Sequence, residues 1–461
     1  MERKQERAVG ANGELTTREM YRRAISVAWP AVLESFFISL AGMIDTMMVA
    51  TMGSYAVAAV GLTAQPKFIA LTVFFAINVA VSALVARRKG EQDRESANET
   101  FLTAFIMAMT ACVVITAVFL IFTPQLMRLA GSNEDTHASA VTYFRVIIGG
   151  TVFNVISMTI NSAQRGSGNT RISMTTNVVS SIVNIVFNYL LIGGKFGFPK
   201  LGVFGAALAT VLGTVAAAGM SIASLYRKKS YVSIPFIIQK RVRARMRDIR
   251  LIVHLAANMI VENLAMRVGF VATALMAARL GTDVFAAHNI GMNLLGLTFS
   301  FADGMQVAGV ALAGEALGAG KKEDARQYGS ICQRIGFFIS LGLSAFLLLG
   351  GRWFFGLYFP DAPHILDYGV LICRFMAVIC ILQISQIIFG ACLRAAGDVR
   401  YALVSSLISC TLIRTGVTIL CVQVLGLGLT GIWLGILGDQ IMRFIFMSLR
   451  FKAGKWVDIK L

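Results

Sequence analysis

Carboxyl side chains lie inside long apolar segments of this chain, where an ionisable group is costly and marks a candidate functional site. Asp45 lies in AGMIDTMMVA, and Glu34 precedes it by eleven residues, about three helical turns, so both fall on roughly one helix face. A buried carboxylate can hold a proton, or it can bind Na⁺ together with neighbouring oxygen atoms. We therefore predict that Asp45 holds H⁺ or Na⁺. For both Asp45 and Glu34, a structural hydrogen bond or exposure at the membrane interface is the alternative.

Two asparagines stand one helical turn apart in the segment SIVNIVFNYLLI. Asn184 and Asn188 together offer amide oxygens and N–H donors on one helix face. We predict that they complete a polar pocket for H⁺ or Na⁺ with Asp45. The alternative is that the two amides join neighbouring helices by hydrogen bonds.

Further polar residues are candidates for binding substrate or a proton. Glu262 lies in ANMIVENLAMRVGF, and Arg267 follows five residues later, a spacing that does not stack the two side chains on one face. Glu262 is thus not neutralised locally and is predicted, with Glu34, to hold a cationic substrate or a second proton. Pairing with a basic residue on another helix is the alternative. Asp303, with Gln306 three residues later, is another ionisable candidate.

The first half of the chain is repeated in the second. Trp29–Ala97 aligns with Ala257–Ala325 at a constant offset and without gaps, and this brings Glu34 onto Glu262. Internal repeats in an apolar chain are typical of transporters, whose site lies where the halves meet. Asp45, however, falls on Thr273, which cannot ionise. The repeat therefore predicts cation coupling centred on the first half, with Glu262 serving substrate or an auxiliary proton.

The elements that carry these residues are predicted to be transmembrane helices. The chain is 56% hydrophobic and 14% charged, against about 25% charged in soluble proteins. Because backbone groups in lipid must be paired within their own segment, the apolar runs are expected to be helices. The sequence predicts an all-α membrane protein with twelve spans at 24–50, 57–86, 101–122, 138–162, 172–193, 202–226, 251–278, 284–314, 328–350, 365–392, 401–424 and 428–448.

Lysine and arginine predict the orientation of these spans. One side carries most of them, with nine between positions 227 and 250, whereas the other side's loops carry only Arg128, Lys195, Lys200, Arg279 and Arg352. Both termini are therefore predicted to be cytoplasmic, in a multi-pass protein of the cytoplasmic (inner) membrane. This topology also explains the net charge of +18 without nucleic acid as a partner.

The predicted organisation has two six-helix lobes. It comprises an N-tail (1–23), a first lobe (24–226), a basic linker (227–250), a second lobe (251–448) and a C-tail (449–461). Lys67 follows Pro66 in the second span, where the proline can break the helix. Arg374 and Arg414 lie within later spans and are expected to neutralise carboxylates. We expect a monomer in the lipid bilayer, with no cofactor other than the coupling ion.

Several motifs together resemble those of the multidrug and toxic compound extrusion (MATE) family, of bacterial type. The first span has Pro30 followed by IDTMMVATMG, and a polar loop of each half reads QRGSGNTR or LRAAGDVR. The sixth span opens with GVFGAALAT, and the seventh leads into LGTDVFAAH. The resemblance covers about residues 20–450, which is nearly the whole chain.

This resemblance implies a twelve-helix exporter that expels cationic or amphipathic compounds in exchange for H⁺ or Na⁺. It maps the family's cation-site carboxylate onto Asp45, its span 5 polar pair onto Asn184 and Asn188, and its span 7 glutamate onto Glu262. Gln383 stands where some relatives have an aspartate of a second-lobe sodium site, which weakens such a site here. Gln383 is kept as a substrate or proton residue.

The sequence as a whole predicts a cation-coupled multidrug antiporter that works by alternating access. The alternative is a flippase for lipid-linked sugars from the same superfamily, for which about fourteen spans and an arginine-lined cavity are expected. An enzyme is not expected, because His254 and His288 lack the partners of a catalytic constellation. The substrate, and the choice between H⁺ and Na⁺, stay open at this point.

Overall fold

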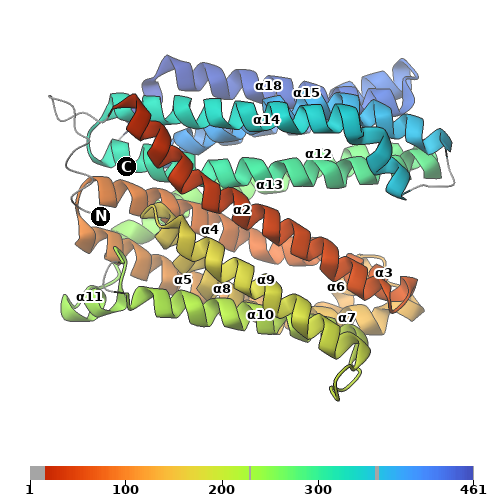
Figure 1. Cartoon of the computed structure of the whole chain (residues 1–461), viewed down its shortest axis with the longest axis horizontal. Coiled ribbons are helices and arrows are strands. Elements are labelled where there is room, and N and C mark those ends of the chain that lie inside the picture. The colour runs from red at the N-terminus through yellow and green to blue at the C-terminus, as the bar shows by residue number, and fades with distance from the viewer. Residues whose placement is uncertain (1–15, 228–229, 359–362, 460–461) are drawn as a thin grey trace. The chain divides into compact units, whose positions relative to one another are not determined.

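The computed structural model describes residues 16–227, 230–358 and 363–459, and nearly all of them are helical (Figure 1). Within these residues, eleven helices are long and apolar enough to cross a membrane. A twelfth span is formed by two helices that meet at Gly150 with a bend of 44°. The structure therefore confirms the all-α membrane fold and the predicted number of spans.

The helices follow one another along the chain with short connections. The first half contains α2 (Thr17–Ala50), α3 (Ser54–Leu62), α4 (Ala64–Gly90), α5 (Arg94–Ile121), α6 (Thr123–Leu129), α7 (Glu134–Gly149), α8 (Thr151–Gly166), α9 (Thr170–Gly193) and α10 (Gly202–Leu225). The linker carries α11 (Ile234–Gln239). The second half contains α12 (Met246–Arg279), α13 (Thr282–Gly318), α14 (Lys322–Tyr358), α15 (Pro363–Ala396), α16 (Val399–Ser406), the π-helix η2 (Leu407–Arg414), α17 (Thr415–Ile419), the π-helix η3 (Leu420–Val424), α18 (Gly428–Ala453) and the 3₁₀-helix η4 (Lys455–Asp458).

The chain divides into two compact units, and the division falls inside two helices. The first-half unit is Leu33–Ala257, and the second-half unit is Asn258–Leu461 together with the described part of Met1–Val32. The chain thus changes units within α2 and again within α12, at similar places in the repeat. The predicted lobes, by contrast, were divided at the linker.

The start of α2 is held by helices of the second half, which explains its place in that unit. The Arg23 guanidinium lies 2.5 Å from the Glu315 carboxylate of α13. A Cβ added at Gly304 of α13 would lie only 2.5 Å from the Cα of Val32, so the two backbones are in close contact there. Glycine permits this approach because it has no side chain.

Helices α9 and α10 lie side by side in the first-half unit (Figure 1) and pack through glycines of α10. A Cβ added at Gly205 would lie 2.8 Å from the carbonyl oxygen of Leu191, and one added at Gly213 would lie 2.7 Å from that of Ser180. Small residues allow such contacts in lipid, where close packing drives helix association. This packing fixes the position of the polar face of α9.

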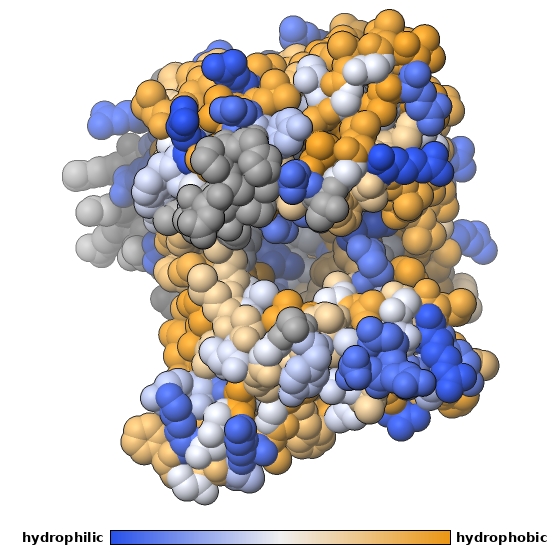
Figure 2. All heavy atoms as spheres, turned by 90° about the vertical axis from the view of Figure 1, so that its right-hand side faces the viewer, coloured by the Kyte–Doolittle hydropathy of each residue, from blue (hydrophilic) through white to orange (hydrophobic). Residues whose placement is uncertain are grey.

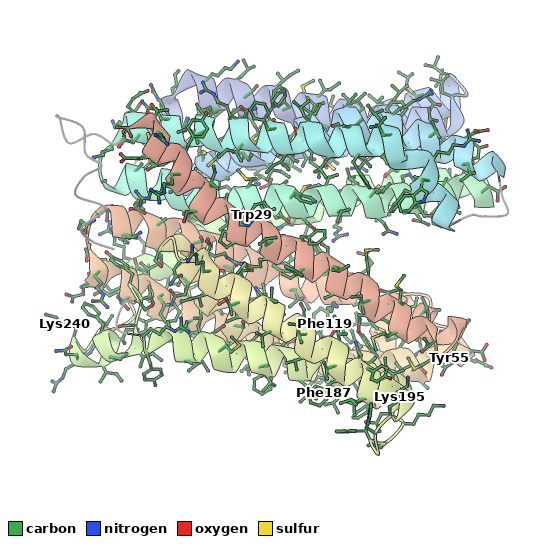
Figure 3. All side chains as sticks on the ribbon, in the orientation of Figure 1. Trp29, Tyr55, Phe119, Phe187, Lys195 and Lys240 are labelled. Carbon is green, nitrogen blue, oxygen red and sulfur yellow. The ribbon has the colours of Figure 1, made fainter. Side chains whose placement is uncertain are left out.

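Large apolar side chains are exposed over much of the helices, which suits contact with lipid tails. Leu349, for example, is 88% exposed and Leu129 is 85% exposed. Figure 2 looks along the helices onto one set of their ends, where hydrophilic residues in blue lie among hydrophobic residues in orange. Within the first-half unit, Lys195 and Lys240 lie at opposite ends of the bundle (Figure 3). The chain is a multi-pass membrane protein.

Candidate cation and substrate sites

Asp45, Asn184 and Asn188 come together in the first-half unit. The Asn188 amide nitrogen donates a hydrogen bond to Asp45 Oδ1 over 2.5 Å, and it lies 3.4 Å from Asn184 Oδ1. The Asn184 amide in turn donates to the hydroxyl of Thr210, in α10, over 3.1 Å. The three residues predicted to lie together are therefore joined by hydrogen bonds in the structure, and their binding of H⁺ or Na⁺ stays a prediction.

A parallel pairing of α2 with α9 brings these residues together. Glu34 bonds Asn177, and Asp45 bonds Asn188, and in both pairs the partners are 143 residues apart. Because the two contacts lie three turns apart on each helix, the helices keep a constant parallel register between them. Asp45 and Glu34 thus share one face of α2, as expected.

The pocket retains an acceptor atom that the protein does not use. The Asn188 side chain is fully buried, and its Oδ1 has no hydrogen-bond partner within the described residues. A buried polar atom without a partner is costly unless a ligand or water satisfies it. Lys67, in α4, acts electrostatically on Asp45. The pocket therefore combines a carboxylate, free amide oxygen and a nearby ammonium group.

Glu34 belongs to a separate cluster nearer the start of α9. Its Oε1 accepts hydrogen bonds from Arg165 over 3.0 Å, from Ser173 over 2.8 Å and from Asn177 over 2.6 Å. The side chain is only 5% exposed, so this is a buried ion pair. The geometry is that of the structural alternative considered for Glu34.

Glu262 has the same kind of environment in the second-half unit. Its Oε1 accepts from Arg394 over 2.8 Å and from the Ser406 hydroxyl over 2.8 Å. Arg394 also donates to Gln306 over 3.3 Å. Pairing with a basic residue of another helix, the alternative considered for Glu262, is therefore what the structure has.

The partner arginines occupy matching motifs, and sequence reasoning missed their role. Arg165 lies in QRGSGNTR and Arg394 in LRAAGDVR. When the repeat is aligned on the two glutamates, Arg394 lies one position past the counterpart of Arg165. A search for basic residues that repeat with nearly the same period as the glutamates would have found both pairs. The repeat thus preserves two buried Glu–Arg pairs, one in each unit.

The remaining predicted residues lie in other settings. Gln383 is fully buried in α15 and accepts a hydrogen bond from Thr298 over 3.0 Å, and its Nε2 has no partner among the described residues. Asp303 is exposed on α13. The structure therefore places Gln383 beside α13 rather than in the Glu262 cluster.

A buried carboxylate that was not predicted as a site residue lies in α18. Asp439 is fully buried between two guanidinium groups, those of Arg443 at 2.8 Å and Arg414 at 3.6 Å. Arg414 thus neutralises a carboxylate, as expected from its position inside a span. The i, i+4 spacing of Asp439 and Arg443 was the available sequence signal.

A cavity of about 520 Å³ lies at the other end of α9 from Asn188. Arg171 and Arg227 line it together with hydroxyl-bearing residues and Met220. It contains none of the predicted site residues, so the candidate cation site is separate from it.

Known proteins resemble this chain over nearly its whole length. The sequence profile of the MatE family matches residues 30–190 and 259–426, one match in each half. A protein of Thermotoga maritima described as a probable multidrug resistance protein NorM is 27% identical over 442 residues, which are 95% of this chain and 93% of that protein.

Solved structures have the same fold. A crystal structure of a MATE protein in complex with MaL6 matches with a TM-score of 0.87 at 24% identity, over 95% of this chain and 97% of that one. An outward-facing multidrug resistance MATE transporter of the MOP superfamily matches with a TM-score of 0.87 at 23% identity, over the same shares of both chains. At these identities the likeness establishes the fold.

Proposed function

The chain belongs to the MatE family of transporters, and from this we propose that it is a cation-coupled multidrug efflux antiporter of the cytoplasmic membrane. It would export cationic or amphipathic compounds by alternating access, as its resemblance to proteins described as multidrug resistance transporters supports. The coupling ion would be its only ligand besides substrate and lipid, and no chemical step would be involved.

The pocket around Asp45 carries this proposal. The carboxylate, the unpartnered Oδ1 of Asn188 and the oxygen of Asn184 can all accept a cation or the proton of a protonated group. Because Asn188 already bonds Asp45, binding of the ion would change the contact between α2 and α9. We propose that this change shifts the packing or bend of α2 and so releases substrate outward.

Lys67 favours H⁺ over Na⁺ as the coupling ion. An ammonium group near Asp45 repels a metal ion, whereas it can exchange protons with the carboxylate as the site opens and closes. Lysine suits this role because its charge responds to burial. We therefore propose H⁺ as the coupling ion, with Na⁺ as the alternative that the experiment below distinguishes.

Glu34 and Glu262 would bind substrate or a proton only when their arginines move away. In the present arrangement each carboxylate is neutralised by a guanidinium group at 3.0 Å or 2.8 Å. A cationic substrate could displace the arginine and take its place. Asp303 and Gln383 are kept as further candidates for contact with substrate or a proton.

Dye efflux from inverted membrane vesicles tests the proposed function. We expect an imposed pH gradient to drive dye transport by the wild type, while an imposed Na⁺ gradient does not. The change Asp45→Asn should abolish gradient-driven transport and leave expression intact, since only a proton site is lost. Asn263→Asp, on α12, is a control that adds a carboxylate outside the pocket.

Gradient-driven transport at the wild-type rate by the Asp45→Asn variant would contradict the role of Asp45. Transport driven by Na⁺ alone would keep the antiporter but replace the coupling ion. The flippase remains the second candidate, and the eleven helices and one bent pair of the described residues count against the longer set of spans expected of it.

A further inference from the structure

The second-half unit contains a buried polar cluster with one carboxylate and two permanent positive charges. Asp439 is fully buried, Arg414 is fully buried, and Arg443 is 5% exposed. Arginine cannot lose its proton in a protein, so both guanidinium groups keep their positive charges at all times. Several of its nitrogen atoms, among them Nε of Arg414 and of Arg443, have no hydrogen-bond partner in the described residues.

This cluster lies at the place that corresponds to the cation pocket of the first-half unit. Thr273 of α12 occupies the position of Asp45 in the repeat. In the first-half unit the Asp45 carboxylate is bonded by an amide from α9. In the second-half unit the Thr273 hydroxyl lies 3.5 Å from Nη2 of Arg414. A guanidinium group therefore contacts the position at which the first-half unit has its ionisable carboxylate.

Backbone packing supports this correspondence independently of the repeat in α2 and α12. In the first-half unit, Gly205 packs on the backbone of Leu191. In the second-half unit, Gly431 packs in the same way on Cys421. α18 thus corresponds to α10 with Gly431 at the position of Gly205, and the same alignment places Asp439 at the position of Gly213.

The same correspondence makes Arg414 the counterpart of Asn184. A Cβ added at Gly213 would lie 3.2 Å from the Cβ of Asn184, and Asp439, at the matching position, faces Arg414. Both Asn184 and Arg414 therefore face the same position of the neighbouring helix. Arg414 contacts Thr273, the counterpart of Asp45, directly, whereas Asn184 is linked to Asp45 through the amide of Asn188.

A π-helix accounts for the register that brings Arg414 to this place. Asn177 and Ser406 are counterparts because each lies twelve residues after the matched arginine and bonds the matched glutamate. Leu191 and Cys421 are counterparts in the glycine packing. The stretch from Ser406 to Cys421 is one residue longer than the stretch from Asn177 to Leu191. η2 lies within this stretch, and a π-turn is the usual way in which a helix accommodates an insertion, often at a functional site.

The two sites differ in whether their basic side chains can release a proton. In the first-half unit the basic group that acts on Asp45, among the residues that the structure describes, is Lys67, whose ammonium can release its proton. The counterpart of Lys67 in the repeat is the apolar Leu295. In the second-half unit the positive charges are those of arginines, which are permanent.

We propose that Arg414 is a tethered cation. Its guanidinium permanently fills, in the second-half unit, the place that the coupling cation takes in the first-half unit. Of these two matching places, only the one at Asp45 therefore exchanges a cation in each transport cycle. This inference rests on the proposed role of Asp45. It makes Arg414 the residue that sets the cation stoichiometry of the transporter.

Moving the tethered cation into the first-half unit is the first test. In the variant Asn184→Arg, the guanidinium should take the place of the coupling cation beside Asp45, although Asp45 itself is intact. We expect proton uptake by the purified full-length protein, measured on acidification, to fall by one proton per molecule. Thr175→Arg, which adds the same guanidinium at an exposed position of α9 outside the Asp45 site, is the matched control and should retain that proton. Normal proton uptake by a folded Asn184→Arg variant would overturn the proposal.

Removing the tethered cation is the reciprocal test. The variant Asp45→Asn should have lost its exchangeable proton. Adding Arg414→Asn and Arg443→Ala, the first-half residues at these positions, leaves Asp439 without positive partners and should restore one exchangeable proton per molecule. Adding Asp439→Gly as well should remove it again. A folded Asp45→Asn, Arg414→Asn, Arg443→Ala protein without the restored proton would refute the inference.

The two sets of variants separate this inference from the proposed function. If Asp45→Asn alone keeps the exchangeable proton, the role of Asp45 fails whatever the arginine variants do. If Asp45→Asn loses the proton but neither swap has its expected effect, only the tethered cation is refuted. If the variant with Asp45→Asn, Arg414→Asn and Arg443→Ala does not fold, the Asn184→Arg variant alone tests the tethered cation, because it retains every charge of the second-half unit. Monodisperse elution from a sizing column establishes that each variant is folded.

Discussion

At the scale of single residues, the main feature is the pair of Glu–Arg contacts that the repeat preserves. Glu34 with Arg165 and Glu262 with Arg394 have distances of 3.0 Å and 2.8 Å, and both carboxylates are 5% exposed. Two buried charges in contact stabilise a structure little compared with apolar residues, but loss of one partner leaves the other uncompensated. Within each pair, the glutamate and the arginine therefore depend on each other for charge neutralisation.

Removal of Arg394 alone should destabilise the protein more than removal of both partners. We expect Arg394→Gln to lower the free energy of unfolding by about 3–5 kcal/mol, since Glu262 is left buried and unpaired. The double variant Arg394→Gln, Glu262→Gln should recover much of this loss. Thermal unfolding in detergent measures both, and Arg352→Gln, a change of an exposed arginine, is the control. Equal losses in the single and double variants would argue against a buried ion pair.

The candidate site could be predicted from the sequence in part. Asp45, Asn184 and Asn188 were recognised because each is a polar residue in an apolar helix, and such residues have few possible partners. Arg165 and Arg394 were missed because they lie at helix ends, where arginine usually serves topology. Asp439 was missed because its counterpart in the repeat is Gly213, so the repeat itself gives no signal there.

At the scale of helices, the positions of the spans were predictable, but of their interruptions only the break near Pro66 was. The second predicted span is divided at Thr63, between α3 and α4, and Pro66 follows within the first turn of α4. Proline fits the first turn of a helix because the N–H that it lacks would be unpaired there. The bend at Gly150, which follows directly on Gly149, and the π-helix η2 were not predicted.

Close packing of α10 on α9 should be needed for the geometry of the cation pocket. Gly213→Val would put side-chain atoms within 2.7 Å of the Ser180 carbonyl oxygen and 3.2 Å of Asn184, so the helices must separate. We expect a loss of stability of about 1–3 kcal/mol and weaker gradient-driven transport. Gly219→Val is the matched control, because nothing lies within 4 Å of the Cβ position at Gly219. Similar behaviour of the two variants would rule out this packing role.

At the scale of the whole molecule, the orientation of the bundle in the membrane is a prediction from charge. Lys195 and Lys240 lie at opposite ends of the first-half unit (Figure 3), and both are exposed. The seven native cysteines are all buried, which keeps their background reactivity low. These features allow a direct test of the topology.

Single cysteines at these two positions should react from opposite sides of the membrane. We expect Lys240→Cys to be labelled by an impermeant maleimide only in inverted vesicles, and Lys195→Cys only in intact cells. The reason is that the loop around Lys240 is rich in arginine and belongs on the cytoplasmic side. The unaltered protein shows the background labelling. The reverse pattern would invert the topology, and with it the direction of export.

The change of units within α2 has a consequence for how the protein is made. Arg23 contacts Glu315, which is 292 residues later in the chain. At about 5–20 residues per second, a ribosome needs about 15–60 s to reach that partner. During this time the first turns of α2 are already synthesised while the helices that hold them do not yet exist. The start of α2, although it is synthesised first, can therefore reach its final position only after α13 has been synthesised.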